Sequence, residues 1–364
     1  MNLTTLFDSA AASRDKATGS ITIRRPDDWH VHLRDGAMLR AVLPFTAGQF
    51  ARGIIMPNLV PPVTTVEAAA AYRTRILAAR PAASDFEPLM TCYLTDATSP
   101  DEIEKGHSEK VWTAAKLYPA GATTNAHHGV TDIKALRPVL ERMERIGMPV
   151  LIHGEATDPS IDIFDREAVF MEQSLLPLLR DHQGLKVVIE HVTTAETVDI
   201  VRAHASHVAG TITPHHLVIN RTSLFQGGLR PHFYCLPVAK RERHRLALRR
   251  AVTSGDSCFF IGTDTAPHLA NLKEAACGCA GVFVGATALQ TYVQVFDEEG
   301  ALDRFEAFAS RNGANFYGLP LNKGTIELKR HAVAMPAAIT VDGDEVVIFR
   351  GEEAMPWSIG EVRP

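Results

Sequence analysis

The chain of 364 residues has few cysteines, no long apolar run and no excess of positive charge. Five cysteines, an odd number without the pattern of a disulfide framework, favour a reducing cytoplasm, and Cys277 and Cys279 are read as ordinary loop thiols. Apolar runs such as Cys258–Ile261 are far shorter than the roughly 20 residues that span a bilayer. A net charge of −5 supplies no broad positive field for nucleic acid. We therefore expect a cytoplasmic protein that contacts neither membrane nor nucleic acid.

The remaining composition is that of a globular protein, with 46% hydrophobic and 22% charged residues. Residues 1–20 lack the basic start and apolar stretch of a secretory signal, and we predict a flexible leader there. No repeat and no low-complexity linker divides the rest of the chain.

Short apolar runs alternate with longer amphipathic stretches along most of the chain. The runs lack polar alternation, which is typical of parallel strands covered on both faces. This order predicts an α/β fold, a (β/α)8 TIM barrel of the metal-dependent hydrolase type over residues 21–320. The predicted strands are 29–33, 53–57, 89–94, 114–117, 149–152, 186–189, 208–212 and 258–261, and the predicted helices include 66–80, 133–146, 165–179, 196–203 and 240–252.

The last part of the chain has a different pattern. Residues 325–328, 338–341 and 345–349 predict short strands, with Asp342-Gly343 as a hairpin turn between the last two. We expect residues 321–364 to form a small C-terminal extension packed on the barrel.

Histidines follow several of the predicted strands, where barrel enzymes place their active residues. His30 and His32 are two residues apart, so both side chains can point to one side of a strand. His153 and His191 each follow another apolar run directly. Any one of these is more often a structural histidine, but the set predicts a metal site. Imidazole suits Zn, Cu, Fe or Ni, and added carboxylate oxygens favour Zn or Mn.

Two further residues follow the eighth run. Asp264 is placed to bind metal and to act as general base, although an N-cap or turn role is common for Asp. His268, four residues later, is predicted to contact substrate instead of metal, with a simple surface position as the alternative.

Lys116, at the end of the fourth run, has three interpretations. It could extend to solvent, form a Schiff base with a carbonyl substrate, or take up CO2 as a carbamate that bridges two cations. The four histidines and Asp264 favour the carbamate, because two adjacent cations need anionic ligands.

These residues, together with several long motifs, resemble those of the dihydroorotases of the single-function bacterial type, in the amidohydrolase superfamily. The resemblance covers nearly the whole chain from Arg24 to about Leu319, with no departure at any ligand position. The motifs are Arg25–Gly36, Met56–Thr65, Ala115–Ala120, Ile212–Leu217 and Cys277–Gly281.

The resemblance implies a role for each site residue. One zinc would be bound by His30, His32, Asp264 and Lys116, modified to N6-carboxylysine. A second zinc would share the carboxylated Lys116 with His153 and His191. The substrate would be held by Arg34 and Asn58 at its carboxylate, with His32, His268 and the backbone of Leu236 and Ala280, under a mobile loop that carries Thr123 and Thr124.

The resemblance also implies a reaction, the reversible cyclisation of N-carbamoyl-L-aspartate to (S)-dihydroorotate and water in de novo pyrimidine biosynthesis. A hydroxide bridging two zinc ions would attack in the hydrolytic direction, and Asp264 would transfer its proton to the ring nitrogen. A homodimer is expected. The alternatives are another cyclic-amide hydrolase, such as a hydantoinase or allantoinase, and a non-catalytic scaffold on the same fold.

Overall fold

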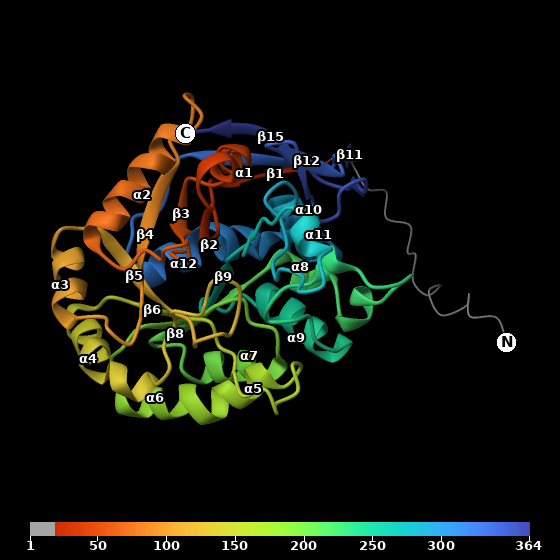
Figure 1. Cartoon of the computed structure of the whole chain (residues 1–364). Helices are drawn as coiled ribbons and strands as arrows, with labels where there is room; N and C mark the ends of the chain where they lie inside the picture. The colour runs from red at the N-terminus through yellow and green to blue at the C-terminus, as the bar shows by residue number, and fades with distance from the viewer. Residues whose placement is uncertain (1–18) are drawn as a thin grey trace.

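Eight parallel strands form the centre of the molecule in a computed structural model that describes residues 19–364 (Figure 1). They pair in chain order, as a barrel requires. Every predicted strand is present, with ends shifted by at most two residues, and 208–212 is matched at both ends. The strands are β2 (Asp27–Val31), β3 (Arg52–Ile55), β4 (Glu87–Tyr93), β5 (Trp112–Leu117), β6 (Val150–Ile152), β7 (Val187–Ile189), β8 (Val208–Ile212) and β9 (Phe259–Ile261).

The barrel closes through the segment that follows β9. The Asp264 N–H donates to the His30 carbonyl at 2.9 Å, and the His32 N–H donates to the Thr265 carbonyl at 3.1 Å. Because the strands are parallel, all of their carboxyl ends lie at one rim. The hydrogen bonds that close the barrel therefore join two of the predicted ligand segments at that rim.

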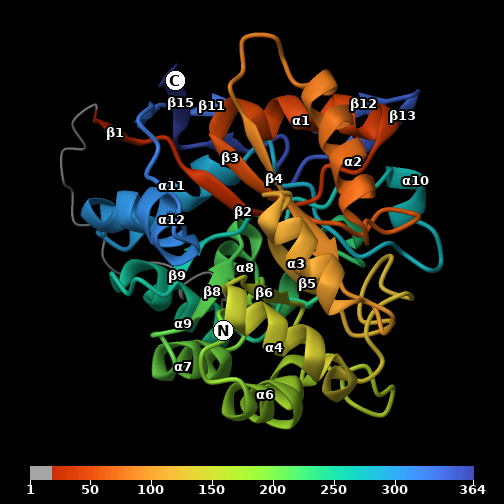
Figure 2. The ribbon, with the colours of Figure 1, turned by 90° about the vertical axis from the view of Figure 1, so that its left-hand side faces the viewer.

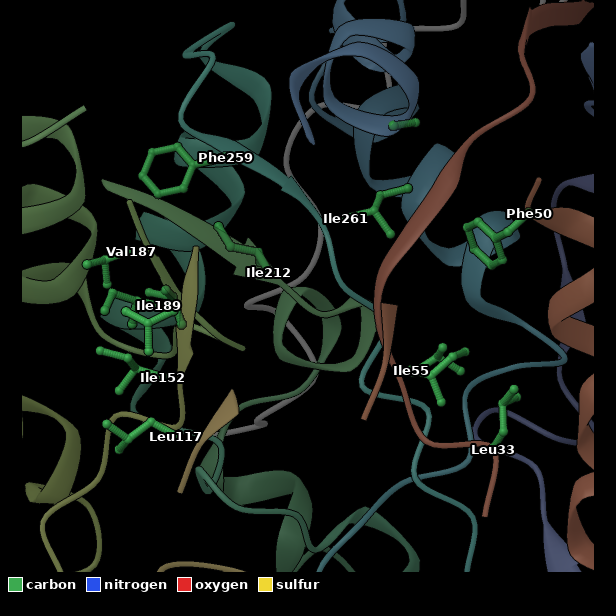
Figure 3. Packing of buried hydrophobic residues seen from close by; sticks show 14 of the residues in the cluster. Leu33, Phe50, Ile55, Leu117, Ile152, Val187, Ile189, Ile212, Phe259 and Ile261 are labelled. Atoms are coloured by element: carbon green, nitrogen blue, oxygen red, sulfur yellow. The ribbon is translucent and has the colours of Figure 1, made fainter. Parts of the chain in front are cut away.

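Side chains along each strand alternate between the inside of the barrel and the helices around it. Leu117, Ile152 and Ile189 belong to the outer apolar layer and lie close together on neighbouring strands (Figure 3). Ala114 belongs to a separate inner cluster with residues of other strands. Lys116 follows Ala114 by two residues, so its side chain shares the inner face.

The helices lie around the barrel (Figure 2). Thr65 caps α2 by accepting from the Ala68 N–H, and Gly147, with φ 72°, ends α4 as predicted. The predicted helix 165–179 contains a π-helical turn, Met171–Leu175, between α5 and α6. None of the helices between residues 19 and 364 has the length and apolar character needed to cross a membrane. The helices are α1 (Gly36–Gln49), α2 (Val66–Ala79), α3 (Pro100–Ser108), α4 (Arg137–Ile146), α5 (Arg166–Phe170), α6 (Leu176–Asp181), α7 (Ala195–Ala203), α8 (Pro214–Val218), α9 (Glu242–Thr253), α10 (Ala270–Lys273), α11 (Ala288–Glu298) and α12 (Asn312–Tyr317).

The C-terminal residues form small antiparallel sheets beside the barrel. β12 and β13 make the predicted hairpin, with Asp342 and Gly343 at φ 50° and 91° in its turn. β10 pairs with β15 and with β1, so this sheet joins both ends of the described chain. Residues 1–18 of the leader expected at 1–20 lie outside the described residues. Its last residue, Ser20, is the first residue of β1. The strands are β1 (Ser20–Arg24), β10 (Thr325–Lys329), β11 (Val333–Ala334), β12 (Ala338–Val341), β13 (Asp344–Val347), β14 (Ala354–Met355) and β15 (Ser358–Arg363).

Candidate active site and metal centre

Three of the predicted ligands meet at the rim, next to the closing hydrogen bonds. The Nε2 atoms of His30 and His32 are 3.3 Å apart and lie 3.3 and 3.1 Å from Asp264 Oδ1. All three side chains are buried. Ligands about 2.1 Å from a tetrahedral zinc are separated by about 3.4 Å, close to these spacings. The donor set therefore fits one zinc ion.

His153 and His191 form a second group beside the first. His153 Nδ1 lies 3.1 Å from His191 Nε2, and both rings are buried. Ligand atoms of His30, His191 and Asp264 all lie within 4.8 Å of one another, so the two groups adjoin. Two cations can therefore be held side by side, each by imidazole nitrogens.

Lys116 is fully buried next to these groups. Its Nζ has no hydrogen-bond partner among residues 19–364. Burial lowers the pKa of Lys116 to about 8, although the negative charges of Glu190 and Asp264 act in the opposite direction. A buried amine without a partner is costly in a folded protein. Conversion to a carbamate would give this position anionic oxygens for two cations, so Lys116 fits the predicted bridging ligand.

Glu190 and Glu155, two residues without a predicted role in the site, orient the histidines. Glu190 Oε2 accepts from His30 Nδ1 at 2.7 Å, and Glu155 Oε2 accepts from His153 Nε2 at 2.8 Å. Each contact uses the ring nitrogen that faces away from the metal cluster, which leaves the other nitrogen free to bind a cation. The sequence does carry a signal for Glu190. It lies two residues after Val188, whose side chain faces the inside of the barrel, so strand alternation places Glu190 on the same inner face.

Three site residues adopt positive φ angles that residues other than glycine rarely take. The values are 58° at Arg34, 42° at His191 and 46° at Asp264. In a regular strand His191 would point outward, because Glu190 occupies the inward position before it. The left-handed conformation turns the chain at this point, which accounts for both residues reaching the same site.

A small cavity opens onto the ligand cluster, and most of the predicted substrate residues line it. Two predicted site residues, Lys116 and His268, are not part of the lining formed by the described chain. His268 Nε2 nevertheless lies 3.0 Å from Arg34 Nη2. The predicted residues in the lining are His30, His32, Arg34, Asn58, Thr123, Thr124, His153, His191, Leu236, Asp264 and Ala280.

The predicted mobile loop lies across this cavity and is hydrogen-bonded on two sides. Thr124 Oγ1 donates to the Ala280 carbonyl at 3.2 Å, and Asn58 Nδ2 donates to the Thr124 carbonyl at the same distance. Asn125 Nδ2 donates in return to the Asn58 carbonyl at 3.1 Å. The structure therefore shows the loop in contact with two of the residues predicted to bind substrate.

A second buried cluster contains His215, His216 and Cys235, whose ligand atoms also lie within 4.8 Å of one another. Both ring nitrogens of His216 already have partners, Thr213 Oγ1 at 2.8 Å and the Pro237 carbonyl at 3.0 Å. No lone pair of His216 is therefore left for a cation without loss of a hydrogen bond. The rim cluster is therefore the stronger candidate for a metal centre.

Comparison with known proteins identifies relatives of nearly equal length. A dihydroorotase of Sphingopyxis alaskensis is 60% identical over 342 residues, which cover 94% of this chain and 99% of the relative. A dihydroorotase of Synechococcus sp. (strain RCC307) is 60% identical over 95% of this chain and 99% of its own.

Solved structures show the same similarity. Dihydroorotase from Campylobacter jejuni superimposes with a TM-score of 0.87 at 31% identity, over 94% of this chain and 98% of its own. Dihydroorotase from Saccharomyces cerevisiae, in complex with 5-fluoroorotic acid, also has a TM-score of 0.87 and 31% identity, over 95% of this chain and 99% of its own. An L-hydantoinase from Arthrobacter aurescens, at 16% identity and a TM-score of 0.76, shares the fold alone.

The profile of the amidohydrolase family matches residues 22–347, most of the chain. Together with relatives that are 60% identical over almost their whole length, this match shows that the chain belongs to the amidohydrolase family, within its dihydroorotase group.

Proposed function

We propose that the protein catalyses the reversible cyclisation of N-carbamoyl-L-aspartate to (S)-dihydroorotate and water, a reaction of de novo pyrimidine biosynthesis. The supporting observation is that Arg34 lines the same cavity as the histidines and Asp264. A guanidinium beside a metal-ligand cluster suits a substrate whose carboxylate lies close to the reacting amide. The relatives named dihydroorotases support the same assignment.

The rim cluster would hold two zinc ions. His30, His32 and Asp264 would bind one, His153 and His191 would bind the other, and Lys116 as its carbamate would bind both. When bound, the ions would lower the pKa of a water molecule and polarise the amide carbonyl, which supplies a nucleophile near neutral pH.

Asp264 is proposed as the group that moves the proton. Burial on its own would raise the pKa of Asp264, but charge attraction and hydrogen bonds from His30 and His32 hold that pKa well below its usual value. The carboxylate is therefore ionised and able to accept a proton from the attacking water on one oxygen. In the hydrolytic direction it would then deliver this proton to the departing ring nitrogen, and in the synthetic direction the transfer is reversed.

The remaining cavity residues would orient the substrate. Arg34 and Asn58 would hold its carboxylate, with His32 and His268 beside them, and the backbone of Leu236 and Ala280 would contact the ring. The loop with Thr123 and Thr124 would exclude water while the substrate is bound.

An absorbance assay with dihydroorotate tests the proposal. The purified protein should hydrolyse dihydroorotate, lose this activity on chelation and regain it with zinc and bicarbonate. Metal analysis should find two zinc ions per chain, and labelled bicarbonate should leave label on Lys116. A protein that is folded and loaded with zinc but inactive with dihydroorotate, and active with an uncharged hydantoin, would overturn the assignment in favour of the alternative hydrolase.

We further infer a homodimer and a cytoplasmic location. All five cysteines are free thiols, as expected in a reducing compartment. Light scattering from the purified protein should give twice the mass of one chain.

A further inference from the structure

Lys273 is a buried lysine outside the predicted site that binds three backbone carbonyls. It lies at the end of α10 with 5% of its surface exposed. Its Nζ donates to the carbonyls of Cys279 at 2.8 Å, Gly281 at 2.5 Å and Tyr234 at 3.1 Å. An ammonium group has three protons, so these three acceptors use all of its hydrogen-bonding capacity.

The carbonyls belong to two segments that form one wall of the cavity. Leu236 follows Tyr234 by two residues, and Ala280 lies between Cys279 and Gly281; both line the cavity. The Gly281 N–H also donates to the Tyr234 carbonyl at 3.0 Å, which joins the two segments directly. Lys273 therefore holds together the two pieces of backbone that face the ring-binding end of the site.

The hydrogen bond to Cys279 also sets the direction of the next N–H group. In a planar trans peptide the C=O of one residue and the N–H of the following residue point in opposite directions. Because the Cys279 carbonyl points at Lys273, the Ala280 N–H points away from it. Ala280 is mostly buried but lines the cavity, and its own carbonyl accepts from Thr124 in the loop.

We propose that Lys273 is a positioning residue that fixes the Ala280 peptide, so that its N–H is available to an acceptor atom of the substrate and its carbonyl to the closed loop. This inference rests on the proposed function for the identity of the substrate. Burial lowers the pKa of Lys273 to about 8, partly offset by the nearby Cys235 and Cys279, so the ammonium form prevails at neutral pH.

Close packing around Gly281 supports a fixed backbone at this point. Gly281 has φ 147°, and a Cβ atom there would lie 2.7 Å from the Ala266 carbonyl oxygen and 2.8 Å from the His268 ring. The backbone at Gly281 therefore packs closely against the loop that follows β9 and carries His268. The Cys279 and Gly281 carbonyls on this backbone are held by Lys273.

Orotate, a planar unreactive relative of the proposed substrate, provides a binding probe independent of turnover. Lys273→Met should weaken orotate binding and raise KM for dihydroorotate by about three- to tenfold, as expected for loss of one well-oriented hydrogen bond, with a smaller change in kcat. Lys273→Arg, which keeps cationic donors, should restore most of the affinity. Lys186→Met is the control, because Lys186 is also a partly buried lysine that donates to a backbone carbonyl, that of Phe316 at 3.1 Å, at the amino end of β7 and away from the cavity.

The outcomes separate this inference from the proposed function. Equal orotate affinity in Lys273→Met, Lys186→Met and the unchanged protein would overturn the role of Lys273. Orotate binding that depends on Lys273 in a protein inactive with dihydroorotate would support the positioning role and overturn the proposed reaction. Should Lys273→Met fail to fold, Lys273→Gln retains two N–H donors on a neutral amide, and its affinity should fall below that of Lys273→Arg; equal affinities would contradict the proposal.

Discussion

Arg34 Nη2, in the lining of the cavity, lies 3.0 Å from His268 Nε2. Arg34 Nε also donates to the Pro267 carbonyl at 3.2 Å. Two contacts from one segment thus hold the guanidinium in a single orientation, while its remaining N–H groups are available to a bound anion.

Arg34→Ala should raise KM for dihydroorotate by about 100-fold, since a hydrogen bond between charged groups contributes about 1.5–3 kcal/mol. Steady-state kinetics over a wide substrate range gives KM and kcat separately. Arg75→Ala is the control, because Arg75 forms an exposed ion pair with Asp35. An unchanged KM in folded Arg34→Ala would show that another group binds the carboxylate.

His268 should make the protein less stable in acid. Burial, reinforced by the charge of Arg34, lowers the pKa of His268 to about 2, below its ordinary value of 6.5. Its stabilising contribution is therefore complete above pH 6.5 and decreases as the pH falls below that value, where the unfolded chain takes up a proton that the folded chain does not. His268→Gln should show a smaller loss of Tm between pH 7 and pH 4. Parallel curves for both proteins would contradict this.

Asp264→Asn should lower kcat by about two to four orders of magnitude, because the amide cannot accept the proton. Metal analysis on the same sample separates this effect from loss of zinc. Asp256→Asn, at an exposed ion pair with Arg202, controls for a change of one charge. Nearly unchanged turnover in Asp264→Asn would remove the proton-transfer role.

Glu190→Gln should weaken zinc binding by about 10- to 100-fold, because the amide no longer fixes the tautomer of His30. Glu190 also accepts from Thr211 Oγ1 at 2.7 Å, so Thr211→Val tests the same arrangement more mildly. Competition with a chelator of known affinity measures the change. Equal zinc affinity in Glu190→Gln and the unchanged protein would show that other contacts orient the ring.

Thr124→Val should reduce kcat/KM by about three- to tenfold, because valine has a similar volume but cannot make a hydrogen bond of about 1 kcal/mol. In the unchanged protein this hydrogen bond joins Thr124 Oγ1 to the Ala280 carbonyl. Thr131→Val, which breaks an exposed hydrogen bond with Asp96, is the control at the other end of the loop. The same kcat/KM in both variants would count against a role of Thr124 in closure.

The fold was predictable because its signals are local. Each strand is a short apolar run, and several runs end with, or are followed within a few residues by, the side chains that reach the rim. The hairpin at Asp342-Gly343 likewise follows from the positive φ angles that this dipeptide readily adopts. The division of the chain at residue 321 stays a prediction, because β1 and β10 pair across that boundary.

The roles of Glu190 and Lys273 were not predicted, because they depend on distant parts of the chain. Glu190 forms a hydrogen bond with His30, which is 160 residues away in the sequence. Lys273 forms one with Tyr234, which is 39 residues away. Both side chains also occur commonly at solvent-exposed positions, so residue type by itself does not indicate burial.

The sequence by itself determined that this is a parallel barrel whose strand ends carry histidines, a lysine and an aspartate, because strand periodicity and ligand chemistry belong to individual segments. Tertiary structure decided which atoms face one another: the positive φ angle that turns His191 inward, and the carboxylates that orient the rings. Those contacts form only when strands distant in sequence are brought to one rim, and no local pattern specifies the pairs.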